Sequence, residues 1–318
     1  MKMITCIKPG KSLSLLLDAA TEIQMDPEPT EQDKAFLTRQ LVQVTLPHSS
    51  PGNVPIWKRK NGNLTLSIRP GWDHKKDQPV GYPFGSIPRL LLFWITTEAL
   101  RTKSRKIELG ASLTKFIRDV GLNPSTGGGK RGDGNRLRNQ MERLFRATIS
   151  LEVNTNDNKA SGKRWIDMQV APEGELWWNF KNPDQSTLFN SWIELGEKFY
   201  EAIISSPVPL DKRALKALKR SPLALDLYAW ATYKTYSLNH HQKAEQLISW
   251  HAFMAQLGAE YNDHKNFKKK AKIAFKKVRA VYPGLEMEEV DGGFIIRQGK
   301  TAIRQRRSRR KISTKCGG

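Results

Sequence analysis

Trp94-Ile-Thr opens a pattern that runs to Phe145, and Trp230-Ala-Thr opens a second copy that runs to Phe275. Each copy begins with an apolar helix and continues with a short helix in which a Phe precedes a Gly by five positions. A loop, a basic amphipathic helix and a predicted strand pair follow. This order is typical of a winged-helix module, whose basic helix lies in a DNA groove. The repeat therefore predicts an α+β fold with two tandem winged-helix domains.

The two basic helices are predicted at residues 135–147 and 264–281. Each has an apolar stripe with helical spacing, which indicates one buried and one exposed face. The stripes consist of Leu137, Met141, Leu144 and Phe145 in the first helix, and Phe267, Ala271, Ala274, Phe275 and Val278 in the second. The second helix contains no acidic residue, and lysines four positions apart repel each other by a few tenths of a kcal/mol. A polyanionic partner is the simplest explanation.

Candidate DNA contacts lie opposite the apolar stripes and in the predicted wings. Arg, Asn and Gln side chains can form bidentate hydrogen bonds with guanine or adenine edges, whereas lysines are suited to phosphates. The candidates are Arg136, Asn139, Gln140 and Arg143 in the first helix, Lys163 and Arg164 in the first wing, Lys265, Asn266, Lys269, Lys270, Lys272, Lys276 and Lys277 in the second helix, and Arg297 in the second wing.

Net charge supports a polyanionic partner. The chain carries 53 Lys and Arg against 31 Asp and Glu, a formal net charge of +22 with an isoelectric point near 10. Residues 264–318 hold 17 of these cations and only 4 acidic residues. Such clustering favours a binding surface for nucleic acid over general solubility, although a merely solvated basic surface stays open as the alternative.

The sequence divides into four segments by composition and turn signals. We expect a flexible N-terminal arm at 1–38, with one helix over Ser12–Ile23, and a first winged-helix domain at 39–206. A second winged-helix domain is expected at 207–300, and a disordered basic tail at 301–318. Alternating apolar and polar residues predict strands at 41–46 and 63–68. The dipeptide Asp291-Gly292 predicts the turn of a hairpin.

Several classes of protein are disfavoured by the residues that are present. The chain has two cysteines, Cys6 and Cys316, which lie near opposite termini and offer neither a disulfide framework nor a zinc knuckle. The glycine-rich stretch before Arg131 lacks the first Gly and the Ser/Thr of a phosphate-binding loop. His240 and His241 are adjacent, without the helical spacing that directs two imidazoles at one metal. We therefore expect no enzyme activity, metal or cofactor. The lack of a signal or membrane-span pattern predicts a cytoplasmic protein.

A family resemblance becomes specific at Gly81-Tyr-Pro-Phe-Gly-Ser-Ile-Pro-Arg-Leu90 and continues through Arg101-Thr-Lys-Ser-Arg105 to Phe116-Ile-Arg-Asp-Val-Gly121. Across roughly residues 40–300 the chain resembles the RepA family of plasmid replication initiators. The resemblance implies a bacterial, plasmid-associated protein that binds directly repeated origin sequences, called iterons, in double-stranded DNA. It implies origin opening, recruitment of the host initiator and replicative helicase, possible dimers, and no catalytic centre.

Two functions stay open, of which the first is the one that the resemblance implies. The first is a replication initiator that binds iterons, and the second is a transcriptional repressor, of its own promoter or of another, that uses the same DNA-binding modules. A nicking relaxase is disfavoured because it needs a catalytic Tyr beside a metal-binding His cluster.

Overall fold

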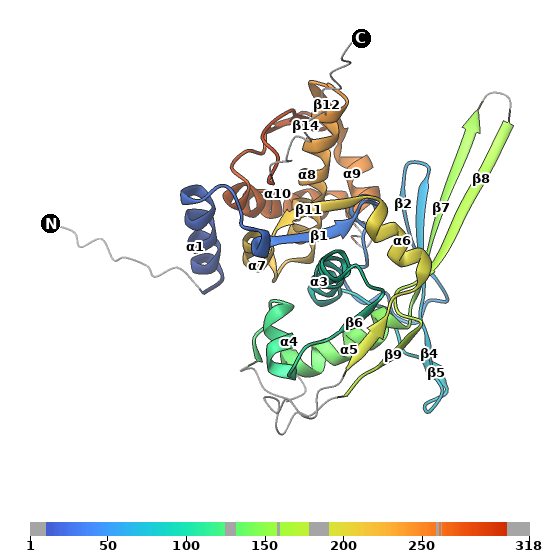
Figure 1. Ribbon diagram of the computed structural model, residues 1–318. Helices are drawn as coiled ribbons and strands as arrows, with labels where there is room; N and C mark the ends of the chain where they lie inside the picture. The colour runs from blue at the N-terminus through green and yellow to red at the C-terminus, as the bar shows by residue number, and fades with distance from the viewer. Residues whose placement is uncertain are drawn as a thin grey trace, which may run out of the picture.

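The computed structural model describes residues 11–124, 132–157, 160–177, 191–258, 261 and 263–303. Within these ranges helices and antiparallel strands are interspersed along the chain (Figure 1). The helices are α1 (Lys11–Met25), α2 (Arg39–Gln43), α3 (Ser86–Thr102), α4 (Leu113–Asp119), α5 (Asp133–Phe145), α6 (Glu197–Ser205), α7 (Lys212–Leu218), α8 (Pro222–His240), α9 (Trp250–Leu257) and α10 (His264–Val281). The strands are β1 (Lys34–Thr38), β2 (Trp57–Asn61), β3 (Leu64–Arg69), β4 (Trp72–Asp73), β5 (Gln78–Pro79), β6 (Lys106–Glu108), β7 (Thr148–Asp157), β8 (Ala160–Gln169), β9 (Glu173–Glu175), β10 (Trp192–Glu194), β11 (Pro207–Asp211), β12 (Glu245–Ser249), β13 (Met287–Val290) and β14 (Gly293–Arg297).

Two long helices and a short strand pair form the centre of the molecule. β1 pairs antiparallel with β11, with Lys34 opposite Asp211 and Thr38 opposite Pro207. α3 packs against β1, α8 packs against β11, and the two helices also contact each other. Both helices bury residues around most of their circumference, as expected for helices that are covered on several sides.

The largest sheet has the strand order β2-β3-β7-β8. β7 and β8 pair from Thr148 and Gln169 at one end to Asp157 and Ala160 at the other. β3 pairs with β7 only as far as Val153. The outer parts of β7 and β8 therefore project beyond the sheet as a two-stranded ribbon, which is visible on the right of Figure 1.

The C-terminal half combines α8, α9 and α10 with a sheet of order β12-β14-β13. Ser249 caps α9 by accepting a hydrogen bond from Ala252 N. Gly292, with φ of 72°, completes the turn between β13 and β14, where a residue with a side chain would be strained. The hairpin predicted around Asp291-Gly292 is thus confirmed.

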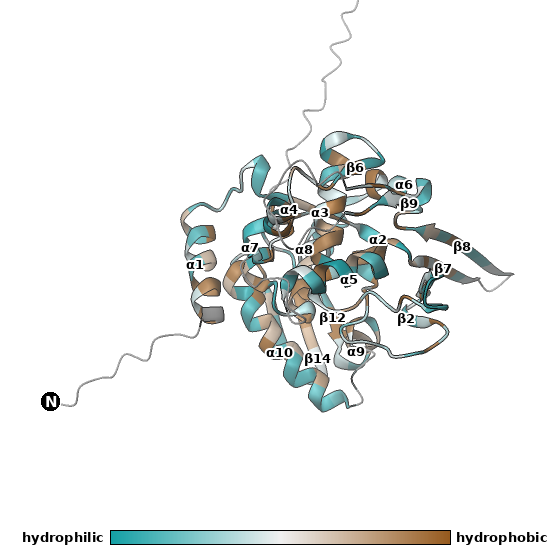
Figure 2. Ribbon diagram, turned by 90° about the horizontal axis from the view of Figure 1, so that it is seen from below, coloured by the Kyte–Doolittle hydropathy of each residue, from teal (hydrophilic) through white to brown (hydrophobic). Residues whose placement is uncertain are grey.

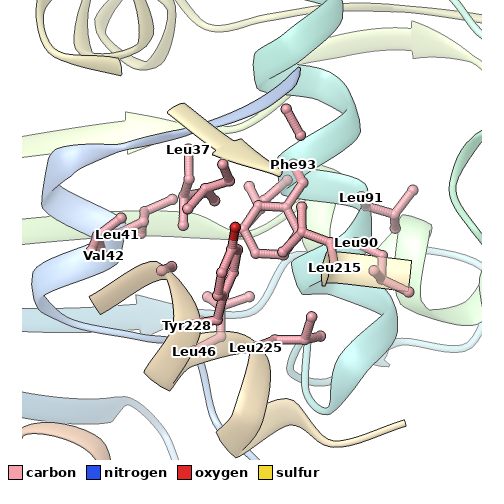
Figure 3. Packing of buried hydrophobic residues seen from close by; sticks show 14 of the residues in the cluster. Leu37, Leu41, Val42, Leu46, Leu90, Leu91, Phe93, Leu215, Leu225 and Tyr228 are labelled. Atoms are coloured by element: carbon pink, nitrogen blue, oxygen red, sulfur yellow. The ribbon is translucent and has the colours of Figure 1, made fainter. Parts of the chain in front are cut away.

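One continuous hydrophobic core extends through both halves of the described chain. Figure 3 shows part of it, where Leu37 and Leu41 lie near Phe93 of α3 and Tyr228 of α8. The repeated Trp and Phe positions make equivalent contacts within this core. Trp94 meets Phe116 edge to face with ring centroids 5.0 Å apart, and Trp230 meets Phe253 at the same separation. The sequence repeat therefore corresponds to a repeated packing arrangement.

The N-terminal segment differs in part from the flexible arm predicted for residues 1–38. The helix expected over Ser12–Ile23 is confirmed as α1, which packs against α7 and α10. Leu16, Ala20 and Ile23 are buried in that contact, and β1 is part of the central strand pair. Between residues 11 and 38 the chain is therefore held by tertiary contacts. Residues 304–318 of the predicted basic tail lie outside the described residues.

The strand predicted at 41–46 is wrong, whereas the one predicted at 63–68 is confirmed as β3. Thr38 caps the short helix α2 by accepting a hydrogen bond from Leu41 N. Leu41, Val42, Val44 and Leu46 are all buried, so this segment has no solvent-facing side for an alternating strand to present. Packing of α2 against α8 and β1 outweighs the local alternation.

Candidate nucleic-acid interface

Helix α10 is fixed by an apolar stripe and an N-terminal cap. All five residues predicted to face inward are buried, with Phe267, Ala271 and Val278 fully covered. The Asp263 carboxylate accepts hydrogen bonds from Lys265 N at 2.9 Å and Asn266 N at 3.3 Å, as an N-cap residue does. Packing against α8 and α9 holds the inner face, so the cationic residues are displayed on the outer face.

The outer face of α10 carries several lysines without acidic partners. Asn266 and the side chains of Lys265, Lys269, Lys270 and Lys276 are exposed. Lys277 is half-buried. Among the described residues none of these five lysines forms an ion pair, so their charges are available to an external anion. Figure 2 shows hydrophilic segments along α10 from the side on which α5 is also visible.

Lys272 differs from these lysines because it contacts the neighbouring hairpin. Its Nζ lies 2.6 Å from Glu289 Oε1 on β13, and Lys268 Nζ lies 3.6 Å from the same oxygen. The hydrogen bond from Lys272 lowers the pKa of Glu289. Lys268 also lies over the Trp250 ring, 5.5 Å from its centroid. The charge of Lys272 is thus partly offset within the protein, and this residue is a weaker candidate for a phosphate contact.

Helix α5 shows the same division into two faces. The predicted inward residues Leu137, Met141, Leu144 and Phe145 are all buried. Arg136 and Asn139 are exposed, and Arg136 pairs with Asp133 at the beginning of the helix, 3.2 Å away. The Arg136 side chain is 58% exposed and that of Asp133 20%, so the guanidinium stays accessible and can exchange this ion pair for a phosphate or base contact.

The outward placement predicted for Gln140 is wrong. Its side chain is 8% exposed, and its Oε1 accepts a hydrogen bond from Phe84 N at 2.9 Å. Gln140 is three residues after Leu137 and four before Leu144, so helical geometry directs it towards the buried side. Its amide fixes the turn that precedes α3.

Arg143 is half-buried and faces the same turn. It donates a hydrogen bond to Tyr82 O at 3.4 Å, and its guanidinium lies 5.4 Å from the Phe84 ring centroid. Burial lowers the pKa of Arg143. These contacts leave only part of the side chain accessible, so Arg143 is a weaker candidate than Arg136.

Two further arginines of α5 were not among the sequence-based candidates. Arg138 is exposed and takes part in no ion pair among the described residues, which makes it comparable to Arg136. Arg146 is exposed as well, but it pairs with Glu142 at 3.6 Å and donates a hydrogen bond to Trp72 O. The sequence signal that could have identified Arg138 is its position beside Asn139, next to Leu137 of the buried stripe.

The candidates on the β7–β8 and β13–β14 hairpins differ in how many acidic side chains pair with them. On β8, Lys163 pairs with Glu152 of β7 at 2.8 Å, and Arg164 is exposed next to it. On β14, Arg297 pairs with Glu288 at 2.8 Å and with Glu245 at 3.0 Å. Hydrogen bonds with these two carboxylates raise the pKa of Arg297. The β7–β8 hairpin therefore offers more unpaired positive charge than the β13–β14 hairpin.

The described residues contain no cluster of three or more His, Cys, Asp or Glu side chains that could hold a metal. His240 and His241 contact each other edge to face, with ring centroids 5.0 Å apart, and His240 stacks on Tyr236. In the part of the chain that the structure describes, no helix combines the length and apolar character needed to span a membrane.

The fold and the charge distribution define an α+β protein with two exposed basic helices. A family model described as "Plasmid encoded RepA protein" matches residues 82–252, slightly more than half of the chain. The chain therefore belongs to the RepA family of plasmid replication initiators, as its sequence motifs indicated.

The solved structures that are similar to this chain include two of RctB. A crystal structure of RctB domains 2-3 is 11% identical with a TM-score of 0.46, and the match covers 82% of this chain and 96% of that one. A selenomethionine derivative of domains 2 and 3 of RctB gives the same identity and TM-score, with coverage of 81% and 95%. A search of curated protein sequences found no match.

Proposed function

We propose that this RepA-family protein initiates plasmid replication by binding directly repeated origin sequences through two winged-helix domains. The observation that carries the proposal is the outer face of α10, where Lys265, Lys269, Lys270 and Lys276 are exposed and have no acidic partner among the described residues. Double-stranded DNA is the polyanion whose major groove accommodates such a helix.

Element order in the C-terminal half supports the winged-helix assignment. α8, β12, α9, α10, β13 and β14 follow one another, and β14 lies between β12 and β13 in the sheet. The helix α10 thus directly precedes the hairpin, and β12 completes a three-stranded sheet with that hairpin. In this assignment α10 is the recognition helix and the β13–β14 turn is the wing.

The N-terminal half has the same order with one difference. α3, β6, α4, α5, β7 and β8 follow in sequence, but β6 pairs with β10 and not with the β7–β8 hairpin. We infer that the first domain is a winged helix with an extended wing, and that residues 39–206 and 207–300 are the two units. In this arrangement Arg136, Arg138 and Asn139 of α5 contact a second major groove.

The proposed role requires no catalytic centre, metal or cofactor. Binding would be followed by opening of an adjacent AT-rich stretch and by recruitment of the host initiator and replicative helicase.

The test uses a reporter plasmid, whose replication origin is taken from the plasmid that encodes this protein. When the protein is supplied, we expect protection of direct repeats from nuclease, permanganate-reactive thymines in the neighbouring AT-rich stretch, and plasmid maintenance. A repressor would instead silence a promoter through an inverted repeat, with neither melting nor maintenance. That second result would overturn the initiator assignment while leaving the DNA-binding surface intact.

A further inference from the structure

An isoleucine interrupts the cations on the outer face of α10. Ile273 is 46% exposed even with α1 packed against this helix. Lys269 and Lys270 precede it by four and three residues, and Lys276 and Lys277 follow it by three and four. Because residues at these spacings are neighbours on a helix surface, Ile273 lies among four lysines.

The buried inner stripe of α10 does not require this isoleucine. Single exposed apolar residues are common on protein surfaces, so exposure alone carries no meaning. The inner stripe of α10 is complete without Ile273, since Ala271, Ala274 and Phe275 are already buried. A β-branched residue also has a lower helix propensity than lysine. Its position at the centre of a cationic face is therefore the informative observation.

The surrounding lysines and the isoleucine suit different parts of a DNA groove. Lysine side chains are long and cationic, and they reach the phosphates on either side. A shorter apolar side chain between them faces the edges of the bases. In the major groove the apolar group on a base edge is the C5 methyl of thymine, and apolar side chains make contact with it.

We propose that Ile273 is a specificity-determining residue that contacts the C5 methyl group of a thymine when α10 lies in the major groove. The inference rests on the proposed function, because it requires α10 to be a recognition helix. Removing one buried methyl-sized group from such a contact weakens affinity about fourfold. The expected preference is for thymine over uracil at the same position, since these bases differ only in that methyl.

A uracil scan tests the proposal directly. The duplex is the one that the full-length protein selects from a randomised library, and each thymine in turn is replaced by deoxyuridine. For the wild-type protein, we expect one thymine in the α10 half of the site whose replacement raises Kd about fourfold. For Ile273→Ala, the thymine and uracil duplexes should bind equally, each about fourfold more weakly than the wild type binds thymine.

Leu247→Ala is the matched control, because Leu247 is 64% exposed on β12 and lies outside the helix. This variant should keep the wild-type preference for thymine. Two results would overturn the inference: a scan in which no deoxyuridine replacement weakens wild-type binding, or an Ile273→Ala protein that still prefers thymine to uracil. In either case, sequence-selective binding by the wild-type protein would still support the proposed function. If the wild-type protein selects no sequence at all, the proposed function fails and this inference fails with it. Melting temperatures of both variants verify that each is folded.

Discussion

Arg89 of α3 holds Asp226 of α8 in a buried, bidentate ion pair. Arg89 Nε donates to Asp226 Oδ1 and Nη2 donates to Oδ2, each at 2.7 Å. The two side chains are only 3% and 6% exposed. The remaining donors of Arg89 reach the carbonyl oxygens of Leu46, Pro47 and Gly85, so its charge is fully hydrogen-bonded. This pair connects the main helices of the N-terminal and C-terminal halves.

Asp226→Asn should destabilise the protein strongly. The substitution keeps the size of the side chain but leaves the Arg89 guanidinium buried without its counter-charge, which costs about 3–5 kcal/mol. Urea denaturation followed by circular dichroism gives the free energy of unfolding. Glu201→Gln, which removes the surface partner of Lys198, is the control and should show no measurable change. Equal stability of Asp226→Asn and wild type would contradict a structural role for this pair.

His48 should make the stability of the protein depend on pH near neutrality. Its Nε2 lies 2.8 Å from Asp226 Oδ2, and burial lowers the pKa of His48 despite that hydrogen bond. Since the unfolded state takes up the proton first, stability decreases as pH falls below about 6.5, at up to about 1.4 kcal/mol per pH unit. His48→Gln should lack this decrease.

Asp226 contributes a second, more acidic transition. Burial alone would raise its pKa, but the charge of Arg89 and the hydrogen bond from His48 outweigh burial and hold the pKa well below its usual range. Its contribution is present above about pH 4 and is lost as pH falls further. If the free energy of unfolding of the wild-type protein did not change between pH 6.5 and 5, the assignment for His48 would be contradicted.

The local sequence predicts the two basic helices well because an apolar stripe depends only on spacing along one helix. The prediction from local sequence was wrong for Gln140, because its polar side chain suggested exposure although Leu137 and Leu144 place it on the buried side. The ion pairs of Lys272 with Glu289 and of Arg297 with Glu245 join separate elements, so no local sequence pattern predicts them. The same holds for residues 41–46, whose burial depends on contacts with α8.

Neighbouring residues on α5 should separate DNA contact from folding. Gln140→Ala removes the acceptor for Phe84 N and leaves a partly buried donor unsatisfied, which should cost about 1–3 kcal/mol of stability. Affinity of the folded Gln140→Ala protein for DNA should be unchanged. Asn139→Ala should show the reverse, with normal melting and weaker binding to the cognate duplex. Weaker DNA binding by Gln140→Ala at full stability would return this residue to the interface.

Lys269→Ala with Lys270→Ala should reduce the salt dependence of DNA binding. Each lost phosphate contact lowers the slope of log K against log salt by about 0.9, so the double variant should lose about 1.8. Fluorescence anisotropy at several salt concentrations measures the slope for cognate and random duplexes. Lys198→Ala, on α6, changes the charge outside the proposed interface and should keep the wild-type slope. A double variant with an unchanged slope would remove this part of α10 from the DNA contact.

Phe116→Ala and Phe253→Ala should destabilise the protein by similar amounts. Both rings are fully buried, and each meets its tryptophan at 5.0 Å in the same edge-to-face arrangement. Truncation leaves a cavity and removes an aromatic contact, which costs about 3–5 kcal/mol. Thermal and urea unfolding measure the loss, and Trp165→Ala, at a 67% exposed position on β8, is the control that should unfold like wild type. If only one of the two Phe variants lost stability, the equivalence of the two copies would hold in geometry but not in energy.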